Sequence, residues 1–230
     1  MKRRSFSWGL GFWSISAGVW VAVPARAQIT ETDAADGVRA ALERGANAAV
    51  ALLGRTDGFL GNPKVRIPLP GFLNDAAKLL KATGQQKRID ELVTAMNRAA
   101  EAAMPEAKTL LMSAVKSMSV DDGRRILTGG DDSVTQFFAG KTREPLTERF
   151  LPIVTHQTER MALADKYNAV AGKASGFGLI KPQDANIQQY VTGKALDGLY
   201  LIIGEEERKI RQDPVGTGSA ILKKVFGSLR

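Results

Sequence analysis

The chain has 230 residues and no cysteine, and its 32 Lys and Arg against 24 Asp and Glu give a formal charge of +8. The lack of cysteine excludes disulfides, thiolate metal sites, a cysteine nucleophile and a lipid-anchored N-terminal cysteine. A chain of this length buries roughly 70% of its surface on folding, so it needs no covalent cross-links to be stable.

The first 27 residues have the three parts of an export signal. Basic residues at positions 2–4 precede an uncharged apolar run over residues 8–23, and Ala25-Arg26-Ala27 offers the small residues that a signal peptidase recognises. The apolar run is shorter than the roughly 20 residues of a permanent transmembrane helix. We therefore expect residues 1–27 to be a cleaved signal peptide and residues 28–230 to form a single all-helical domain.

Adjacent arginines in the leader leave the export route open. Arg3-Arg4-Ser5-Phe6 resembles the twin-arginine signal, and glycines and serines make the apolar run only mildly hydrophobic. An ordinary secretory leader also begins with basic residues. Either route delivers the protein to the periplasm, where we expect a soluble protein that is not integral to the membrane.

Removal of the leader halves the excess of positive charge. Four of the 32 basic residues and no acidic residue lie in residues 1–27, which leaves 28 against 24. The remaining basic residues are dispersed, without the interleaved aromatic residues that single-stranded nucleic acid would require. We therefore expect no nucleic-acid partner.

Helical periodicity dominates the mature chain. Apolar residues recur at steps of three and four over residues 38–53 and 89–103. Pro105 predicts a break or kink, after which the apolar stripe continues over residues 110–118. Ser119 and Asp122 have the spacing of a capping box. Further helices are predicted at residues 134–138, 142–170 (with a bend at Pro152), 184–213 and 221–226.

Strands are only weakly indicated. Residues 64–67 alternate between polar and apolar, but Pro63, Pro68 and Pro70 surround them, so we expect an extended loop or an edge piece at best. The predicted fold class is therefore all-α, a multi-helix bundle of about seven to nine helices with no significant sheet.

Several segments, in order along the chain, resemble one bacterial family. The segments are Asp57-Gly58-Phe59-Leu60, Asn62-Pro63, Ile67-Pro68-Leu69-Pro70, Met96-Asn97-Arg98-Ala99-Ala100-Glu101, Ile126-Leu127, Gly129-Gly130-Asp131, Tyr190-Val191-Thr192, Ala195-Leu196-Asp197-Gly198-Leu199, Ile210-Arg211 and Lys224-Val225-Phe226-Gly227. From about residue 33 to the end, the chain resembles the exported family known as domain of unknown function 4197. The resemblance implies a Gram-negative envelope location and an all-helical fold, but no catalytic or binding residue.

No catalytic constellation stands out. His156 is the only histidine, and no Gly-x-Ser-x-Gly elbow is present to pair with it. Its spacing to Glu159 reverses that of helical di-iron sites. Asp121-Asp122 and Asp131-Asp132 stand where helices begin, so we interpret them as caps rather than calcium ligands. We predict no catalytic residue, no metal and no cofactor.

Two features are candidate binding sites. Asn97, Arg98 and Glu101 lie beside an alanine-rich stripe, where helices can approach closely. We expect Arg98 to meet Glu101 or a distant carboxylate and to fasten its helix to a neighbouring helix, so a structural ion pair is the alternative to a binding cluster. Asp57 and Phe59 begin a proline-rich segment that predicts a rigid, exposed recognition loop, or one whose prolines simply set its path.

Two functions remain open. The first is a non-catalytic envelope module that binds another protein or an apolar ligand. The second is an enzyme that uses carboxylates and arginines, with Glu101 or an aspartate pair as acid and base on an envelope polymer such as polysaccharide. A groove lined by Ala, Met and Phe would favour the first, and a pocket with two carboxylates within about 10 Å would favour the second. We prefer the binding module.

Overall fold

The computed structural model describes residues 31–71, 86–130, 132–159, 162–178 and 186–213, together with positions 82, 84 and 181. In these parts the chain forms six helices and no strand: α1 (Glu31–Leu53), α3 (Gln86–Lys116), α4 (Val120–Thr128), α5 (Ser133–Thr158), α6 (Ala162–Gly176) and α7 (Ile187–Gln212). The predicted all-α fold is confirmed, with fewer helices in the described ranges than the seven to nine expected. The predicted leader at 1–27 and the helix at 221–226 lie outside the described residues.

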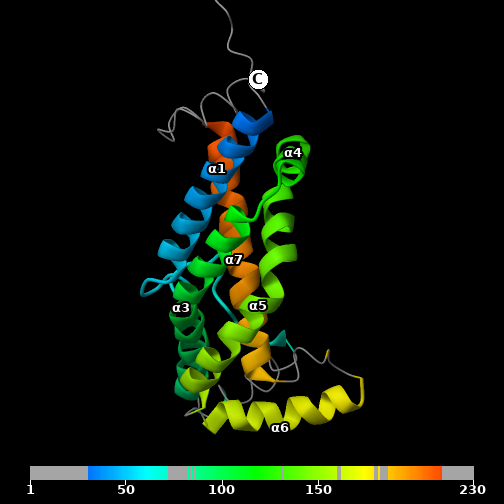
Figure 1. Cartoon of the computed structure of the whole chain (residues 1–230). Coiled ribbons are helices and arrows are strands. Elements are labelled where there is room, and N and C mark those ends of the chain that lie inside the picture. Colours follow the sequence, from blue (N-terminus) through cyan, green and yellow to red (C-terminus); the bar gives the residue numbers. More distant parts are fainter. Residues whose placement is uncertain are drawn as a thin grey trace, which may run out of the picture.

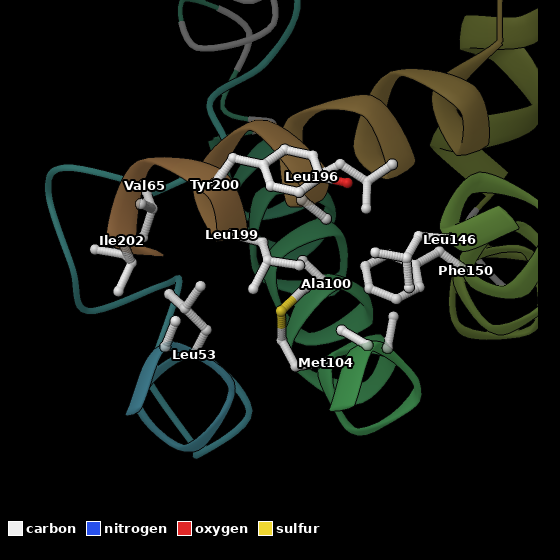
Figure 2. Packing of buried hydrophobic residues seen from close by; sticks show 14 of the residues in the cluster. Leu53, Val65, Ala100, Met104, Leu146, Phe150, Leu196, Leu199, Tyr200 and Ile202 are labelled. Carbon is white, nitrogen blue, oxygen red and sulfur yellow. The ribbon is translucent and has the colours of Figure 1, made fainter. Parts of the chain in front are cut away.

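Four long helices make the bundle. α3 lies against α5, α5 against α7, and α1 against both α3 and α7, while α6 crosses the lower end (Figure 1). The apolar stripes of these helices meet in one core, because each helix can bury its stripe only against another element. Part of this core is drawn in Figure 2, including Leu53, Met104, Phe150 and Leu199, all fully buried.

Prolines do not interrupt the helices. Of the break or kink predicted at Pro105, the break is wrong, because α3 runs through this residue, and α5 likewise contains Pro145 and Pro152. A kink at Pro105 and a bend at Pro152 stay predictions. A proline removes one intrahelical hydrogen bond. Burial of Met104 and Ala107 on either side of Pro105 outweighs that loss, since most helical stability comes from tertiary packing.

The second half of the chain is also divided differently from the prediction. The helices expected at 134–138 and at the start of 142–170 form one continuous helix, α5, which runs through position 142. The expected stretch 142–170 is in turn shared between α5 and α6. The helix continues through Thr142, which is buried and whose hydroxyl donates to the Phe138 carbonyl oxygen at 2.7 Å.

The capping box predicted before α4 is confirmed. The Ser119 hydroxyl accepts the Asp122 backbone N–H at 3.0 Å, and the Asp122 carboxylate accepts the Ser119 N–H at 3.1 Å. The hydrogen bond from the Ser119 backbone, helped by Arg125, lowers the pKa of Asp122 below its usual value. Of the expected pair Asp131-Asp132, Asp131 lies outside the described residues. Asp132 is the N-cap residue of α5, but its side chain makes no cap bond and instead accepts from the Gln136 amide.

Replacing Asp122 with alanine is expected to lower the free energy of unfolding at neutral pH by about 1 kcal/mol. The pKa of this group is lower in the folded than in the unfolded state, so its stabilisation is present above the unfolded pKa and disappears as pH falls through the folded pKa. Urea unfolding from neutral to acid pH measures the effect. The control Asp121→Ala, at an exposed carboxylate, should change little, and a pH-independent deficit for Asp122→Ala would contradict this account.

Candidate functional site

The loop 54–71 leaves the end of α1 and packs across α3 and α7. Its apolar side chains Phe59, Val65 and Ile67 are buried in the bundle, whereas Lys64 and Arg66 between them are exposed. The alternation seen in the sequence at 64–67 is therefore that of an extended segment with one face buried. No neighbouring strand pairs with it in the described parts of the chain, so its backbone polar groups need other partners.

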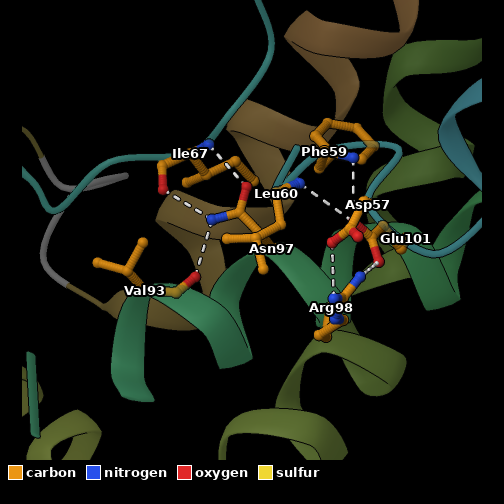
Figure 3. Close-up of polar contacts among 8 residues, drawn as sticks. All are labelled: Asp57, Phe59, Leu60, Ile67, Val93, Asn97, Arg98 and Glu101. Carbon is orange, nitrogen blue, oxygen red and sulfur yellow. Dashed lines mark hydrogen bonds and ion pairs between the residues drawn. The ribbon is translucent and has the colours of Figure 1, made fainter. Parts of the chain in front are cut away.

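Glu101, on α3, supplies partners to the first part of this loop. Its Oε1 accepts the backbone N–H of Phe59 at 3.0 Å and of Leu60 at 3.1 Å. Its Oε2 accepts from the Arg98 guanidinium at 2.6 Å, and Arg98 also donates to Asp57 Oδ1 at 2.7 Å (Figure 3). These two carboxylates, Glu101 first, raise the pKa of Arg98. Glu101 itself is only 5% exposed, and every bond it makes is internal.

Asn97, one turn earlier on α3, supplies partners to the extended part of the loop. Its Oδ1 accepts the Ile67 N–H at 2.8 Å, and its Nδ2 donates to the Ile67 carbonyl at 2.9 Å and to the Val93 carbonyl at 2.8 Å. One amide thus pairs with both backbone groups of a single residue, as an adjacent strand would. Asn97 is completely buried. We call Asn97, Arg98 and Glu101 the loop clamp.

α7 receives the other side of the loop. A Cβ built at Gly198 would lie 2.8 Å from Phe59 Cε1 and 3.2 Å from Val65 Cβ, so only glycine allows this approach. The Tyr190 hydroxyl donates to the Pro68 carbonyl at 3.2 Å, and Lys64 pairs with Glu205 at 2.7 Å. The loop is therefore held between two helices.

Gly198→Ala is expected to destabilise the protein by about 1–2 kcal/mol, because the added methyl group overpacks the contact with Phe59 and Val65. This loss exceeds the gain of up to about 1 kcal/mol that alanine brings to a helix. Gly193→Ala is the matched control on α7, since its Cβ meets nothing within 4 Å and should stabilise the fold. Thermal unfolding measures both variants, and the same direction of change in the two would contradict the assigned role of Gly198.

All five predicted site residues meet at this place: Asp57, Phe59, Asn97, Arg98 and Glu101 (Figure 3). The expected partners of Arg98 are confirmed, since it binds both Glu101 and a distant carboxylate. The expectation that it joins α3 to a neighbouring helix is wrong, because Asp57 belongs to the loop. Arg98 and Asp57 reach solvent, whereas Phe59, Asn97 and Glu101 are enclosed. A binding role for these residues stays a prediction.

A groove of about 720 Å³ opens beside Arg98. It is lined by Gln86, Lys87, Asp90, Glu91, Thr94, Ala95, Arg98 and Gln157. Asp90 accepts from Gln86 at 2.6 Å, and Glu91 lies 3.9 Å from Lys87, so both carboxylates have partners one turn away on α3. Among the described lining residues there is no aromatic side chain and no methionine. The groove therefore differs from the Ala, Met and Phe groove that an apolar ligand would need.

A second hollow lies at the other end of the bundle and is apolar. Side chains of α1, α4, α5 and α7 line it, among them Leu42, Ile126, Val134 and Ile203. Its volume of about 20 Å³ holds no more than a single water molecule. The hollow is therefore a packing defect and offers no room for an apolar ligand.

The remaining sequence candidates lie apart from the loop clamp. His156 is exposed on α5. Within the described ranges, His, Asp and Glu side chains nowhere gather in threes as metal ligands. None of the helices in those ranges is long and apolar enough to cross a bilayer.

Missed from the sequence were Gly198 and Tyr190, which contact the loop from α7. Both stand in segments that carry the family resemblance, Tyr190-Val191-Thr192 and Ala195-Leu196-Asp197-Gly198-Leu199. That signal identified the segments but not the residues with which they pack.

Together the helices and the loop clamp define a helical-bundle protein with a firmly held loop between its first two long helices. The chain belongs to a family described as protein of unknown function, DUF4197, whose family model matches residues 28–227. No curated protein and no solved structure matches the chain.

Proposed function

We propose that the protein is an exported, soluble periplasmic module that binds another protein without catalysis, through the outer face of the loop 54–71. One observation carries the proposal. Two buried side chains, Asn97 and Glu101, form hydrogen bonds with the backbone of the loop. A loop fixed in this way loses little conformational entropy when a partner binds, which is the advantage of a preorganised recognition surface.

The chemistry of that face favours an acidic partner. Arg55, Lys64 and Arg66 are exposed along the loop, with Pro63 and Pro68 beside them. Lys64 is paired with Glu205, whereas Arg55 and Arg66 form no salt bridge with any carboxylate among the described residues. Such arginines are suited to bidentate contacts with carboxylates on another protein.

A charge-reversal experiment tests the recognition surface. The double variant Arg55→Glu/Arg66→Glu is compared with the double variant Lys116→Glu/Lys141→Glu. The control changes two exposed lysines, one on α3 and one on α5. A photo-crosslinker placed at Pro63 in cells should capture an envelope protein, and the loop reversals should abolish this capture while the control retains it. Circular dichroism checks that both variants fold. Equal capture by the two variants would contradict the assignment of the surface.

Export is a separate part of the proposal. We expect the protein recovered from the periplasm to begin at Gln28, because the small residues of Ala25-Arg26-Ala27 precede the predicted cut. Intact-mass measurement decides this point. A mass that includes residues 1–27 would show that the leader is not removed.

The alternative is an enzyme acting on an envelope polysaccharide. The groove beside Arg98 favours it, since Asp90 and Glu91 both line the groove. Glu101 does not, because a general acid must reach the substrate and this carboxylate is buried and bound to the loop. Turnover of envelope polysaccharide that is lost in Glu91→Gln would favour the enzyme over the binding module.

A further inference from the structure

Aspartate is followed by glycine at four places in the sequence, and these places differ in their backbone structure. The pairs are Asp36-Gly37, Asp57-Gly58, Asp122-Gly123 and Asp197-Gly198. Three of them lie within α1, α4 and α7. Asp57-Gly58 alone lies outside a helix, in a turn at the start of the loop 54–71.

An aspartate before glycine can isomerise, because glycine has no Cβ to shield its backbone nitrogen. The Gly58 nitrogen attacks the Asp57 carboxyl carbon, Cγ, and the new C–N bond closes a succinimide ring. One carboxyl oxygen leaves as water, with the N–H proton and a proton from solvent. Water then opens the ring. Cleavage of the Cγ–N bond restores aspartate, whereas cleavage of the original peptide bond gives isoaspartate.

The three helical pairs are held in a conformation that opposes ring closure. The peptide plane after the aspartate must rotate until its nitrogen faces Cγ, and in a helix this rotation breaks the hydrogen bonds of the surrounding turn. The Gly123 N–H, for example, donates to the Ser119 carbonyl at 3.1 Å. Closure at these pairs therefore requires local unfolding of a helix.

Asp57 is less restrained by its backbone. Its side chain is 58% exposed, and its φ of 64° lies in the left-handed region, which costs energy for a residue with a Cβ. Two turn bonds hold its peptide groups: the Gly58 N–H donates to the Arg55 carbonyl at 3.0 Å, and the Asp57 carbonyl accepts the Gly61 N–H at 3.1 Å. Turns at the surface open at a lower free energy than helices of the core.

Arg98 restrains the side chain of Asp57. Its guanidinium donates to Asp57 Oδ1 at 2.7 Å and is itself fixed by Glu101 at 2.6 Å. A charge-assisted hydrogen bond of this kind favours the ionised carboxylate. Because the carboxylate must be neutralised before the nitrogen can attack it, the contact slows ring closure.

The packing around Gly58 leaves no room for the product. Isoaspartate makes the backbone between Asp57 and Gly58 one carbon longer. A Cβ built at Gly58 would already lie 2.4 Å from the Leu53 carbonyl oxygen and 2.6 Å from that of Leu52. Isomerisation would therefore displace the next residue, Phe59, whose N–H binds Glu101.

We propose that Asp57-Gly58 is the site at which the folded protein converts to isoaspartate, and that the contact with Arg98 slows this conversion. The conversion releases the first part of the loop from the loop clamp. The inference is independent of the partner proposed for the loop 54–71, because it concerns a reaction of the chain with water alone.

Ageing of the full mature protein tests the site. The protein is kept for weeks in warm, neutral buffer, and peptide mass spectrometry with electron-transfer fragmentation measures isoaspartate at each of the four pairs. We expect isoaspartate at position 57 and little at positions 36, 122 and 197. In urea, which removes the helices, all four should convert at similar rates. A folded protein in which position 57 converts no faster than the helical pairs would overturn the proposal.

Arg98→Ala tests the restraint. It should speed conversion at position 57 about two- to fivefold, the factor that a solvent-exposed ion pair contributes, and leave the three helical pairs unchanged. Arg149→Ala, which removes an exposed partner of Glu106, is the matched control and should change no site. An unchanged rate at position 57, or equal acceleration at all four pairs as in general unfolding, would overturn the role of Arg98.

A second pair of variants tests the site without altering the loop clamp. In Asp57→Asn the same attack expels ammonia in place of water, and the resulting gain in mass is followed directly. Asp197→Asn is the matched control, because Asp197 is also exposed and paired with an arginine, Arg143, but lies within α7. We expect rapid deamidation in Asp57→Asn and slow deamidation in Asp197→Asn, and similar rates in the two variants would contradict the proposal.

Discussion

Glu101→Ala is expected to lower the free energy of unfolding by about 2–4 kcal/mol, because it removes the acceptor of two backbone N–H groups at once. Those groups, on Phe59 and Leu60, bind the carboxylate at 3.0 and 3.1 Å in an enclosed place. Each buried donor left without an acceptor costs about 1–3 kcal/mol. Urea denaturation followed by circular dichroism measures the loss.

Two variants separate the loop clamp from an ordinary ion pair. Glu106→Ala, on the same helix, removes an exposed carboxylate 3.7 Å from Arg149 and should cost about 0–1 kcal/mol. Glu101→Gln keeps an oxygen for the two N–H groups but turns an amide toward Arg98, so its cost should fall between the two. Similar losses for Glu101→Ala and Glu106→Ala would mean that the loop is not held by this carboxylate.

Local patterns explain how much of the fold could be predicted. Amphipathic periodicity depends only on neighbours three and four residues away, so α1, α3 and α7 could be recognised from residues 38–53, 89–118 and 184–213. The ends of helices at prolines could not, because the packing that holds α3 together around Pro105 comes from other helices. Tertiary contacts thus overrode a local signal.

The candidate site was predictable in its members but not in its architecture. Asn97, Arg98 and Glu101 stood out as polar residues beside an alanine-rich stripe, and Asp57 and Phe59 as part of a proline-rich loop. Nothing in the spacing showed that the loop folds back onto α3, because that path depends on contacts between residues about 30 to 42 positions apart. The close contact of Phe59 and Val65 with Gly198 depends on α7, which comes much later in the chain.

The family resemblance contained more of this architecture than the helical periodicity did. The segments that carry it include residues 57–60, 67–70 and 96–101, which are dispersed in the chain but meet at the loop clamp (Figure 3). Residues 195–199 also carry it, and Gly198 among them contacts the loop at Phe59 and Val65.

Asn97→Ala is expected to cost about 2–4 kcal/mol, comparable with Glu101→Ala, although it removes no charge. The amide satisfies both backbone groups of Ile67, at 2.8 and 2.9 Å, and no water reaches this completely buried side chain. Alanine leaves a donor and an acceptor of the loop without partners and opens a small cavity. Urea denaturation and amide hydrogen exchange at Ile67 measure the loss.

Asn47→Ala is the matched control, because the Asn47 amide also donates to the carbonyl four residues earlier, at 2.8 Å, but is exposed. Its cost should stay within about 0.5 kcal/mol, as is usual for surface positions. Asn97→Asp tests the two hydrogen bonds that the Asn97 amide donates. The introduced carboxylate can still accept the Ile67 N–H, but its second oxygen cannot donate to the Ile67 and Val93 carbonyls. Its deficit should shrink at acid pH, where a protonated carboxyl can donate again, and a deficit that does not change with pH would show that the donated bond to the loop is unimportant.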